Sequence, residues 1–130
     1  MSEFPVNKKK DGEIVKENQI LISVADKNLS FIVEEHLSSI FSLFATYAVR
    51  VNMMQNSAVS FSFCVDYDAH KIPELIITLK ENFSVQFNEQ LSMYTIRHYD
   101  EKSINTILRN RTLLLEQKSR QTIHLVVKAS

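Results

Sequence analysis

Two groups of short polar side chains give this sequence its best candidates for binding a small ligand. The first group directly follows an apolar segment and consists of Asp26, Lys27 and Asn28. The second group lies further along the chain and consists of Asn52, Gln55, Asn56 and Ser57. Amides, hydroxyls and free backbone donors near the start of a helix suit the carboxylate and amino groups of a small amino acid. Ordinary turn and capping chemistry explains the same residues, and on residue types alone it is the simpler explanation.

No residue pattern in the chain predicts catalysis or metal binding. The histidines show no paired-ligand spacing such as HExxH, and they are His36, His70, His98 and His124. The lone Cys64 lies among serines, without the basic neighbour that would activate a thiol. Asp66 and Asp68 fit a loop in which carboxylates cap the following helix, rather than an acid pair for catalysis. We therefore predict no catalytic residue and no metal site.

Composition places the chain among single-domain proteins with a substantial core. It has 130 residues, of which 45% are apolar, and 15 basic side chains balance 15 acidic ones. A net charge of zero provides no general attraction to nucleic acid or to an anionic membrane. Gly12 is the only glycine, so the chain cannot form a glycine-rich phosphate-binding loop. With one cysteine, no signal peptide and no apolar run of about 18 residues, the sequence predicts a cytoplasmic protein.

Hydrophobic periodicity predicts the elements that must position these side chains. In chain order they are a strand at 20–24, a helix at 33–47 with Ser30 as its N-cap, a hairpin with strands at 49–54 and 58–65, a helix at 72–83 and a strand at 85–87. This β-α-β-β-α-β order predicts an α+β, ferredoxin-like fold. In such a fold both helices pack on one face of a four-stranded antiparallel sheet.

The rest of the chain predicts part of a second unit of the same kind. The expected elements are a strand at 91–98, a short helix at 101–108 and strands at 113–115 and 123–127. This β-α-β-β order is an incomplete copy of the first unit, packed on it. The predicted organisation is therefore a polar lead-in or linker at 1–17, a complete unit at 18–88 and a partial unit at 89–130.

The segment at 49–66, VRVNMMQNSAVSFSFCVD, resembles the C-terminal regulatory ACT domains of aspartokinases. The family pattern there is Val-Asp, two apolar residues, a short polar step, Ser-Glu and an alternating Val-Ser strand that ends in Asp. Ile40-Phe41 and Phe44 are similar to the family's first ACT helix. The segments 95–97 and 114–120, with the strand that follows, are similar to the tail of one bacterial subgroup. Together these motifs extend the resemblance over residues 18–128.

The resemblance implies a regulatory role. ACT domains of aspartokinases bind end-product amino acids, usually lysine or threonine, pair with a second subunit and shift the attached kinase toward an inactive arrangement. The kinase uses ATP and Mg to phosphorylate aspartate in the biosynthesis of lysine and related amino acids. Its catalytic domain, with a glycine-rich motif that begins Lys-Phe-Gly-Gly, is absent from this sequence. The chain therefore resembles a regulatory fragment that is not itself an enzyme and has no cofactor of its own.

The resemblance also assigns effector contacts, although the chain departs from the family pattern at two places. Lysine-binding members have Gly-Phe-Leu at the start of the first ACT helix, where this chain has Glu35-His36-Leu37. The family's Val-Asp and Ser-Glu correspond to Val51-Asn52 and Ser57-Ala58, so two carboxylates that could hold an ammonium group are missing. Either Glu35 supplies the compensating charge, the effector differs, or this copy binds nothing. The predicted effector-binding residues are Asn52, Gln55, Asn56, Ser57, Asp26, Asn28, Glu35, His36 and Leu37.

Two other functions are compatible with the same fold. A structural dimerisation module without a ligand would pair through the edge strands of its sheet, and we predict a homodimer in either case. An RNA-binding domain would instead present aromatic side chains on its middle strands for base stacking. Phe61 and Phe63 share a face with Val59 and Val65, as core residues do. The sequence therefore predicts neither a nucleic-acid partner nor membrane association.

Overall fold

The computed structural model describes residues 6–10, 12–28 and 34–129. Within them the chain forms seven strands and three helices, which confirms the predicted α+β class. Its contacts divide it into two compact units, which we call the central unit (Ile20–Glu89) and the split unit (residues up to Gln19 and from Gln90 onward). Strands β2 (Glu13–Asp26) and β5 (Phe83–Arg97) contribute residues to both units. None of the three helices described is long and apolar enough to cross a membrane.

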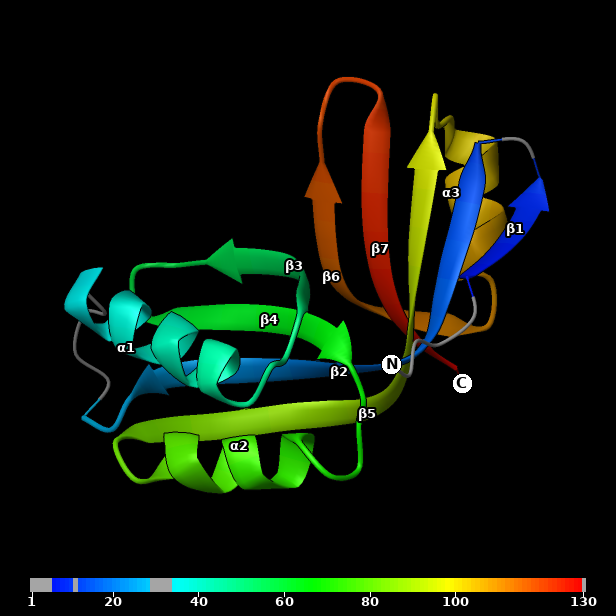
Figure 1. Cartoon of the computed structure of the whole chain (residues 1–130). Helices are drawn as coiled ribbons and strands as arrows, with labels where there is room; N and C mark the ends of the chain where they lie inside the picture. The colour runs from blue at the N-terminus through cyan, green and yellow to red at the C-terminus, as the bar shows by residue number, and fades with distance from the viewer. Residues whose placement is uncertain (1–5, 11, 29–33, 130) are drawn as a thin grey trace. The chain divides into compact units, whose positions relative to one another are not determined.

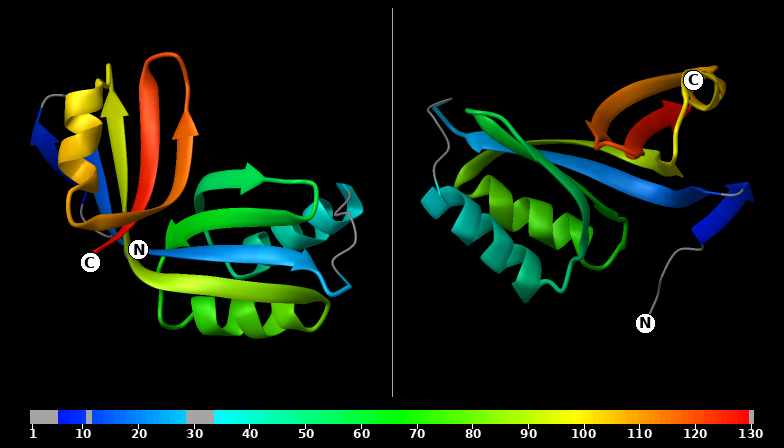
Figure 2. Two further views of the ribbon diagram at one scale, coloured as in Figure 1. Left: turned by 180° about the vertical axis from the view of Figure 1, so that it is seen from behind. Right: turned by 90° about the horizontal axis from the view of Figure 1, so that it is seen from above.

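The central unit has the predicted ferredoxin-like order of elements. After the second half of β2 come α1 (Glu34–Thr46), β3 (Val51–Asn56), β4 (Ser60–Asp66), α2 (Ile72–Lys80) and the first half of β5. Its strands lie in the order β3-β4-β2-β5, and both helices lie on one face of this sheet (Figure 1). The view from above in Figure 2 shows the two helices side by side beneath the strands. The prediction of a β-α-β-β-α-β unit is therefore confirmed.

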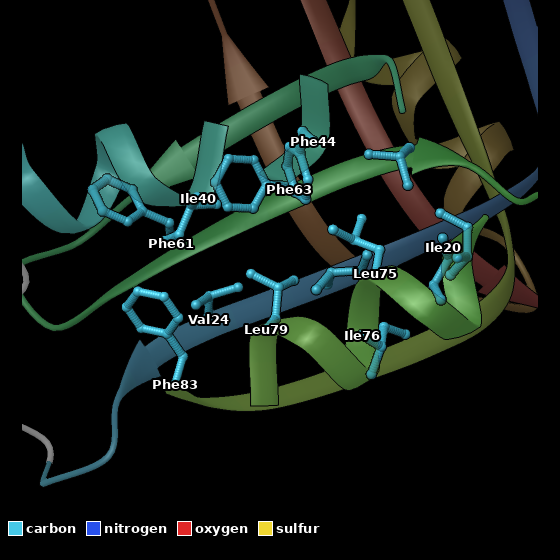
Figure 3. Packing of buried hydrophobic residues seen from close by; sticks show 13 residues of the cluster. Ile20, Val24, Ile40, Phe44, Phe61, Phe63, Leu75, Ile76, Leu79 and Phe83 are labelled. Atoms are coloured by element: carbon cyan, nitrogen blue, oxygen red, sulfur yellow. The ribbon is translucent and has the colours of Figure 1, made fainter. Parts of the chain in front are cut away.

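Alternate strand residues and one stripe of each helix form the core of the central unit (Figure 3). The buried side chains include Ile20, Ile22 and Val24 of β2, Ile40 and Phe44 of α1, Phe61, Phe63 and Val65 of β4, and Ile72, Leu75, Ile76 and Leu79 of α2. Phe63 meets Phe44 edge to face, with ring centroids 4.7 Å apart. The sequence predicts that Val59 shares the buried face of Phe61 and Phe63. In the structure Val59 is 43% exposed, because it precedes the start of β4 at Ser60.

The split unit joins segments from both ends of the described chain. β1 (Val6–Lys10) pairs antiparallel with the first half of β2. The second half of β5 pairs antiparallel with β7 (Thr122–Ala129), which in turn pairs with β6 (Arg111–Lys118). Helix α3 (Glu101–Leu108) connects β5 to β6, so β5-α3-β6-β7 is the predicted partial β-α-β-β unit. The first half of β2 lies beside β5, where a fourth strand completes the order of a ferredoxin-like sheet.

The prediction of a lead-in or linker at 1–17 is wrong for most of those residues. Val6–Lys10 and the residues from Glu13 onward form strands, and Val15 is completely buried in the core of the split unit. The predicted partial unit at 89–130 is therefore incomplete without residues from the start of the chain. Both long strands also continue past the predicted boundaries, with a residue of positive φ near each boundary, Asn18 at 52° and Gln90 at 59°.

Helix α3 begins where its sequence supplies a capping box. The Asp100 Oδ1 atom accepts a hydrogen bond from the Ser103 N–H at 2.8 Å, and the Asp100 N–H donates to the Ser103 hydroxyl at 3.2 Å. Two backbone donors that the first turn of a helix leaves unsatisfied are thereby paired. Ile107, one turn further along, is buried against Tyr94 and Ile96 in the core of the split unit.

A histidine lies half-buried in the β5–β7 pair of the split unit. His124 is directly opposite Thr95, and its Nδ1 atom is 2.8 Å from the Thr95 hydroxyl. Burial lowers the pKa of His124 below its usual value, because the charged imidazolium loses solvation there. The unfolded chain therefore takes up a proton on this residue at a higher pH than the folded protein does.

We expect the free energy of unfolding to decrease as the pH falls below about 6.5, the ordinary pKa of histidine. Above that pH the contribution of His124 is fully present, and it is lost as the pH falls toward the lower pKa of the folded state. Urea denaturation at several pH values between 7.5 and 5 should show a smaller decrease for His124→Gln than for the unchanged protein. His70→Gln, at an exposed histidine, is the matched control. An equal decrease in all three proteins would contradict this assignment.

Candidate functional site

Most of the predicted effector-binding residues lie at one end of the central unit. β2 ends at Asp26, β3 ends at Asn56 and α1 begins at Glu34. Figures 1 and 2 show the arrowheads of β2 and β3 and the first turn of α1 at the same end of the sheet. We call this region, defined by Asp26, Asn28, Glu35, Gln55, Asn56 and Ser57, the polar end. The predicted cap Ser30 lies outside the described residues.

Asn52 lies away from the polar end. It is the second residue of β3, and four residues of strand, or roughly 13 Å, separate it from Asn56. Its Nδ2 atom donates a hydrogen bond to Asp66 Oδ1 at 2.8 Å. The sequence predicts that Asp66 belongs to the loop before α2. In the structure it is instead the last residue of β4. The structure therefore does not bring Asn52 together with the other predicted contacts.

The carboxylate that does organise the approach to α2 belongs to Asp68. Its Oδ1 atom accepts hydrogen bonds from the N–H groups of His70 at 2.8 Å and Lys71 at 3.2 Å. The bond from His70 is the largest of the effects that lower the pKa of Asp68 below its ordinary value. Asp68 thus has the capping role that the sequence predicts for both aspartates, although its side chain bonds to residues just before the helix.

Two residues of the polar end stabilise turns. The Ser57 hydroxyl oxygen accepts hydrogen bonds from the N–H groups of Val59 at 3.3 Å and Ser60 at 3.2 Å. At the other turn, Asp26 Oδ2 accepts from the Asn28 N–H at 2.9 Å. This is the turn chemistry that was the simpler explanation for both groups. Gln55 and Asn56, at the end of β3, are exposed, so their side-chain amides face solvent.

The three predicted contacts on α1 differ in their surroundings. Glu35 is exposed, whereas Leu37 packs against the core of the central unit. The His36 ring lies edge-on to Phe83, with 5.9 Å between the ring centroids. Glu35 therefore offers a carboxylate to solvent at the start of a helix, while His36 and Leu37 contribute mainly to packing. A carboxylate at the same end of the sheet as two exposed amides can accept hydrogen bonds from an ammonium group.

The central unit also contains a pocket that no pattern in the sequence predicts. It has a volume of about 230 Å³ and lies between α2 and β5. Its lining includes Ile77, Lys80, Phe87 and Glu89. Ile77 was the signal available in the sequence, since it lies outside the stripe of α2 residues assigned to the core.

No protein-family model matches this chain, and no curated protein matches it. A solved candidate C-terminal regulatory domain of aspartate kinase from Porphyromonas gingivalis W83 is 21% identical, with a TM-score of 0.73 over 90% of this chain and 85% of that one. The ligand-free regulatory subunit of aspartate kinase from Thermus thermophilus is 12% identical, with a TM-score of 0.62 over 91% of this chain and 87% of that one.

A complete kinase has the same fold in part of its chain. Aspartokinase III from E. coli, solved in complex with lysine and aspartate, is 16% identical, with a TM-score of 0.67. The match covers 86% of this chain and 28% of the E. coli kinase, so this chain corresponds to a minor part of that protein. The predicted resemblance is therefore confirmed at the level of the fold: this chain has the fold of the regulatory domains of aspartate kinases.

Proposed function

We propose that this chain is an amino-acid-sensing regulatory domain that controls an aspartate kinase. The observation that carries the proposal is the fold match, which extends over 90% of this chain and 85% of a candidate regulatory domain. Because the match includes the split unit as well as the central unit, it goes beyond a shared ferredoxin-like sheet. The phosphoryl transfer from ATP to aspartate, with its Mg, belongs in this proposal to a separate catalytic domain or subunit.

The proposed effector site is the polar end. The Glu35 carboxylate, supported by the amides of Gln55 and Asn56, would bind the ammonium group of the effector. The N–H groups of the first turn of α1 would bind its carboxylate. Lysine or threonine is the proposed effector, and the related E. coli kinase was solved with lysine bound. We leave Asn52 out of the direct contacts because of its distance along β3 and its bond to Asp66.

Calorimetric titration of the full chain with lysine, threonine and methionine tests this proposal. We expect lysine or threonine to bind and Glu35→Gln to weaken that binding about tenfold, because a hydrogen bond to a charged group contributes about 1.5–3 kcal/mol. Glu101→Gln is the matched control, since Glu101 is also an exposed acid in the first turn of a helix. If none of the three amino acids gives heat or a thermal shift, the sensing proposal is wrong.

Regulation requires that the effector binds one state of the kinase better than another, commonly by about 1–3 kcal/mol. We propose that the chain acts as a homodimer, paired through the β3 edge of the central unit, which has a strand neighbour on only one side in the described sheet. Analytical ultracentrifugation should then show a dimer whose stability changes with the effector. A dimer that no amino acid affects would favour the alternative, a structural dimerisation module.

A further inference from the structure

The pocket between α2 and β5 has walls from one helix and one strand of the central unit. Pro73, Ile77 and Lys80 follow one another at intervals of four and three residues, so they form a stripe on the side of α2 next to its buried stripe. On β5, Phe87 and Glu89 lie on the same face as Phe83, because alternate strand residues share a face. The pocket therefore opens beside the core and not over it.

The surface of the pocket is apolar and largely open to solvent. Ile77 is 64% exposed and Phe87 is 42% exposed. Beneath them lie Ile20, Ile72 and Ile76, which are buried. A contiguous apolar surface of this kind favours a ligand that covers it, because apolar area is then removed from water.

The two charged residues of the pocket have opposite signs. Lys80 comes from the last turn of α2, and its Nζ atom lies 6.0 Å from the centroid of the Phe87 ring. Glu89 comes from β5, two residues after Phe87. An apolar floor between one ammonium and one carboxylate matches a small molecule that has an apolar group and both charges.

We propose that this pocket binds an L-α-amino acid with an apolar side chain. The side chain covers Ile77 and Phe87, the ligand carboxylate pairs with Lys80, and the ligand ammonium group pairs with Glu89. The volume of about 230 Å³ suits a ligand of this size, since pockets for drug-sized ligands measure about 300–1,000 Å³. This inference rests on the proposed amino-acid-sensing function and adds to it a second site of different specificity.

The pocket and the polar end are separate sites. No residue lines both sites, and Ile20 of the pocket lies six residues before Asp26 on β2, or roughly 20 Å of strand. Lys80 of the pocket is nearer to the turn at Asp26, since the carbonyl of its neighbour Glu81 accepts a hydrogen bond from Lys27 Nζ. Glu89→Gln and Glu35→Gln should each leave binding at the other site unchanged, because residues without shared partners usually behave additively. This separation makes the two proposals independently testable.

Titration of the full chain with L-leucine and L-phenylalanine, by calorimetry and by amide chemical shifts in NMR, tests the pocket. We expect Lys80→Gln and Glu89→Gln each to weaken binding about tenfold, as expected for loss of a charged hydrogen bond. Lys102→Gln and Glu101→Gln, both on α3, remove the same charges at exposed positions outside the pocket, and they should leave binding unchanged. Isocaproate, which lacks the ammonium group of leucine, should bind more weakly than leucine and should not respond to Glu89→Gln.

The outcomes separate this inference from the proposed function. L-leucine binding that Lys80→Gln and Glu89→Gln do not change, or shift changes at Gln55 and Asn56 without any at Ile77 and Phe87, would overturn the pocket while leaving the polar end intact. Leucine binding lost in these variants, with lysine and threonine inactive, would sustain the pocket and overturn the proposed effector. A concentration-dependent dimer that Ile77→Ser abolishes, without amino-acid binding, would show that a second copy occupies the pocket and would overturn the inference.

Discussion

Replacing Phe63 with alanine should lower the free energy of unfolding by about 3–5 kcal/mol. Phe63 is 0% exposed, and its ring lies 4.7 Å from that of Phe44 and 5.7 Å from that of Phe41, between centroids. The substitution therefore removes buried apolar surface, leaves a cavity and breaks two edge-to-face contacts. Because a domain is typically stable by only about 5–15 kcal/mol, this loss is a large part of the total.

Urea denaturation followed by circular dichroism measures this effect. Phe41→Ala is the matched control, because Phe41 belongs to the same aromatic cluster but is 39% exposed, so its loss should cost less than half as much. Phe63→Leu keeps most of the buried volume and gives a measurable value if the alanine variant does not fold. Equal costs for Phe63→Ala and Phe41→Ala would show that Phe63 is not the centre of this core.

Replacing Gly12 with valine should lower the free energy of unfolding by about 2 kcal/mol, the second-largest effect that we expect. Gly12 has a φ of 81°, a backbone conformation that is unfavourable for residues with a Cβ atom. Its carbonyl accepts a hydrogen bond from the Arg97 N–H at 2.8 Å, which holds the two backbones close together. A Cβ atom at Gly12 would lie 3.3 Å from the Arg97 carbonyl oxygen, so valine adds crowding to backbone strain.

Gly12→Asn separates these two causes. Asparagine tolerates positive φ, as Asn18 and Asn110 do in this chain at 52° and 59°, but it still places a Cβ atom near Arg97. We expect Gly12→Asn to cost less than Gly12→Val in thermal and urea denaturation. If Gly12→Val unfolds at the same urea concentration as the unchanged protein, the turn does not impose the conformation described.

The sequence predicts the central unit well because its elements are revealed by local patterns. Ile20, Ile22 and Val24 recur at the strand period, and Ile72, Leu75, Ile76 and Leu79 recur at the helix period, and all of them are buried. The split unit is predicted only from its second part. Val15 belongs to its core, but Ile14 and Val15 are only a two-residue apolar step among charged and polar residues, too short to predict a strand. The sheet around this strand is completed by segments far along the chain.

The candidate site was predictable in outline and not in its distances. The order of elements places the ends of β2 and β3 at the same end of the sheet as the start of α1. It does not show that Asn52 and Asn56 lie at opposite ends of β3. They are only four residues apart in the sequence, but an extended backbone separates them widely in space. The pocket was not predicted for a different reason: Ile77 lies outside the core stripe of α2, but only the packed structure shows that it and Phe87 are exposed in one pocket.

The division of the split unit between distant segments affects how this protein can fold during synthesis. The central unit has all its strands and helices in one continuous stretch, so it can form as soon as Glu89 has left the ribosome. The residues up to Gln19 must then wait for β5, their neighbour in the sheet, and for β7, which contributes to the core around Val15. Closing so long a loop late makes this the slow stage of maturation, during which apolar Val15 is open to wrong partners or to a chaperone.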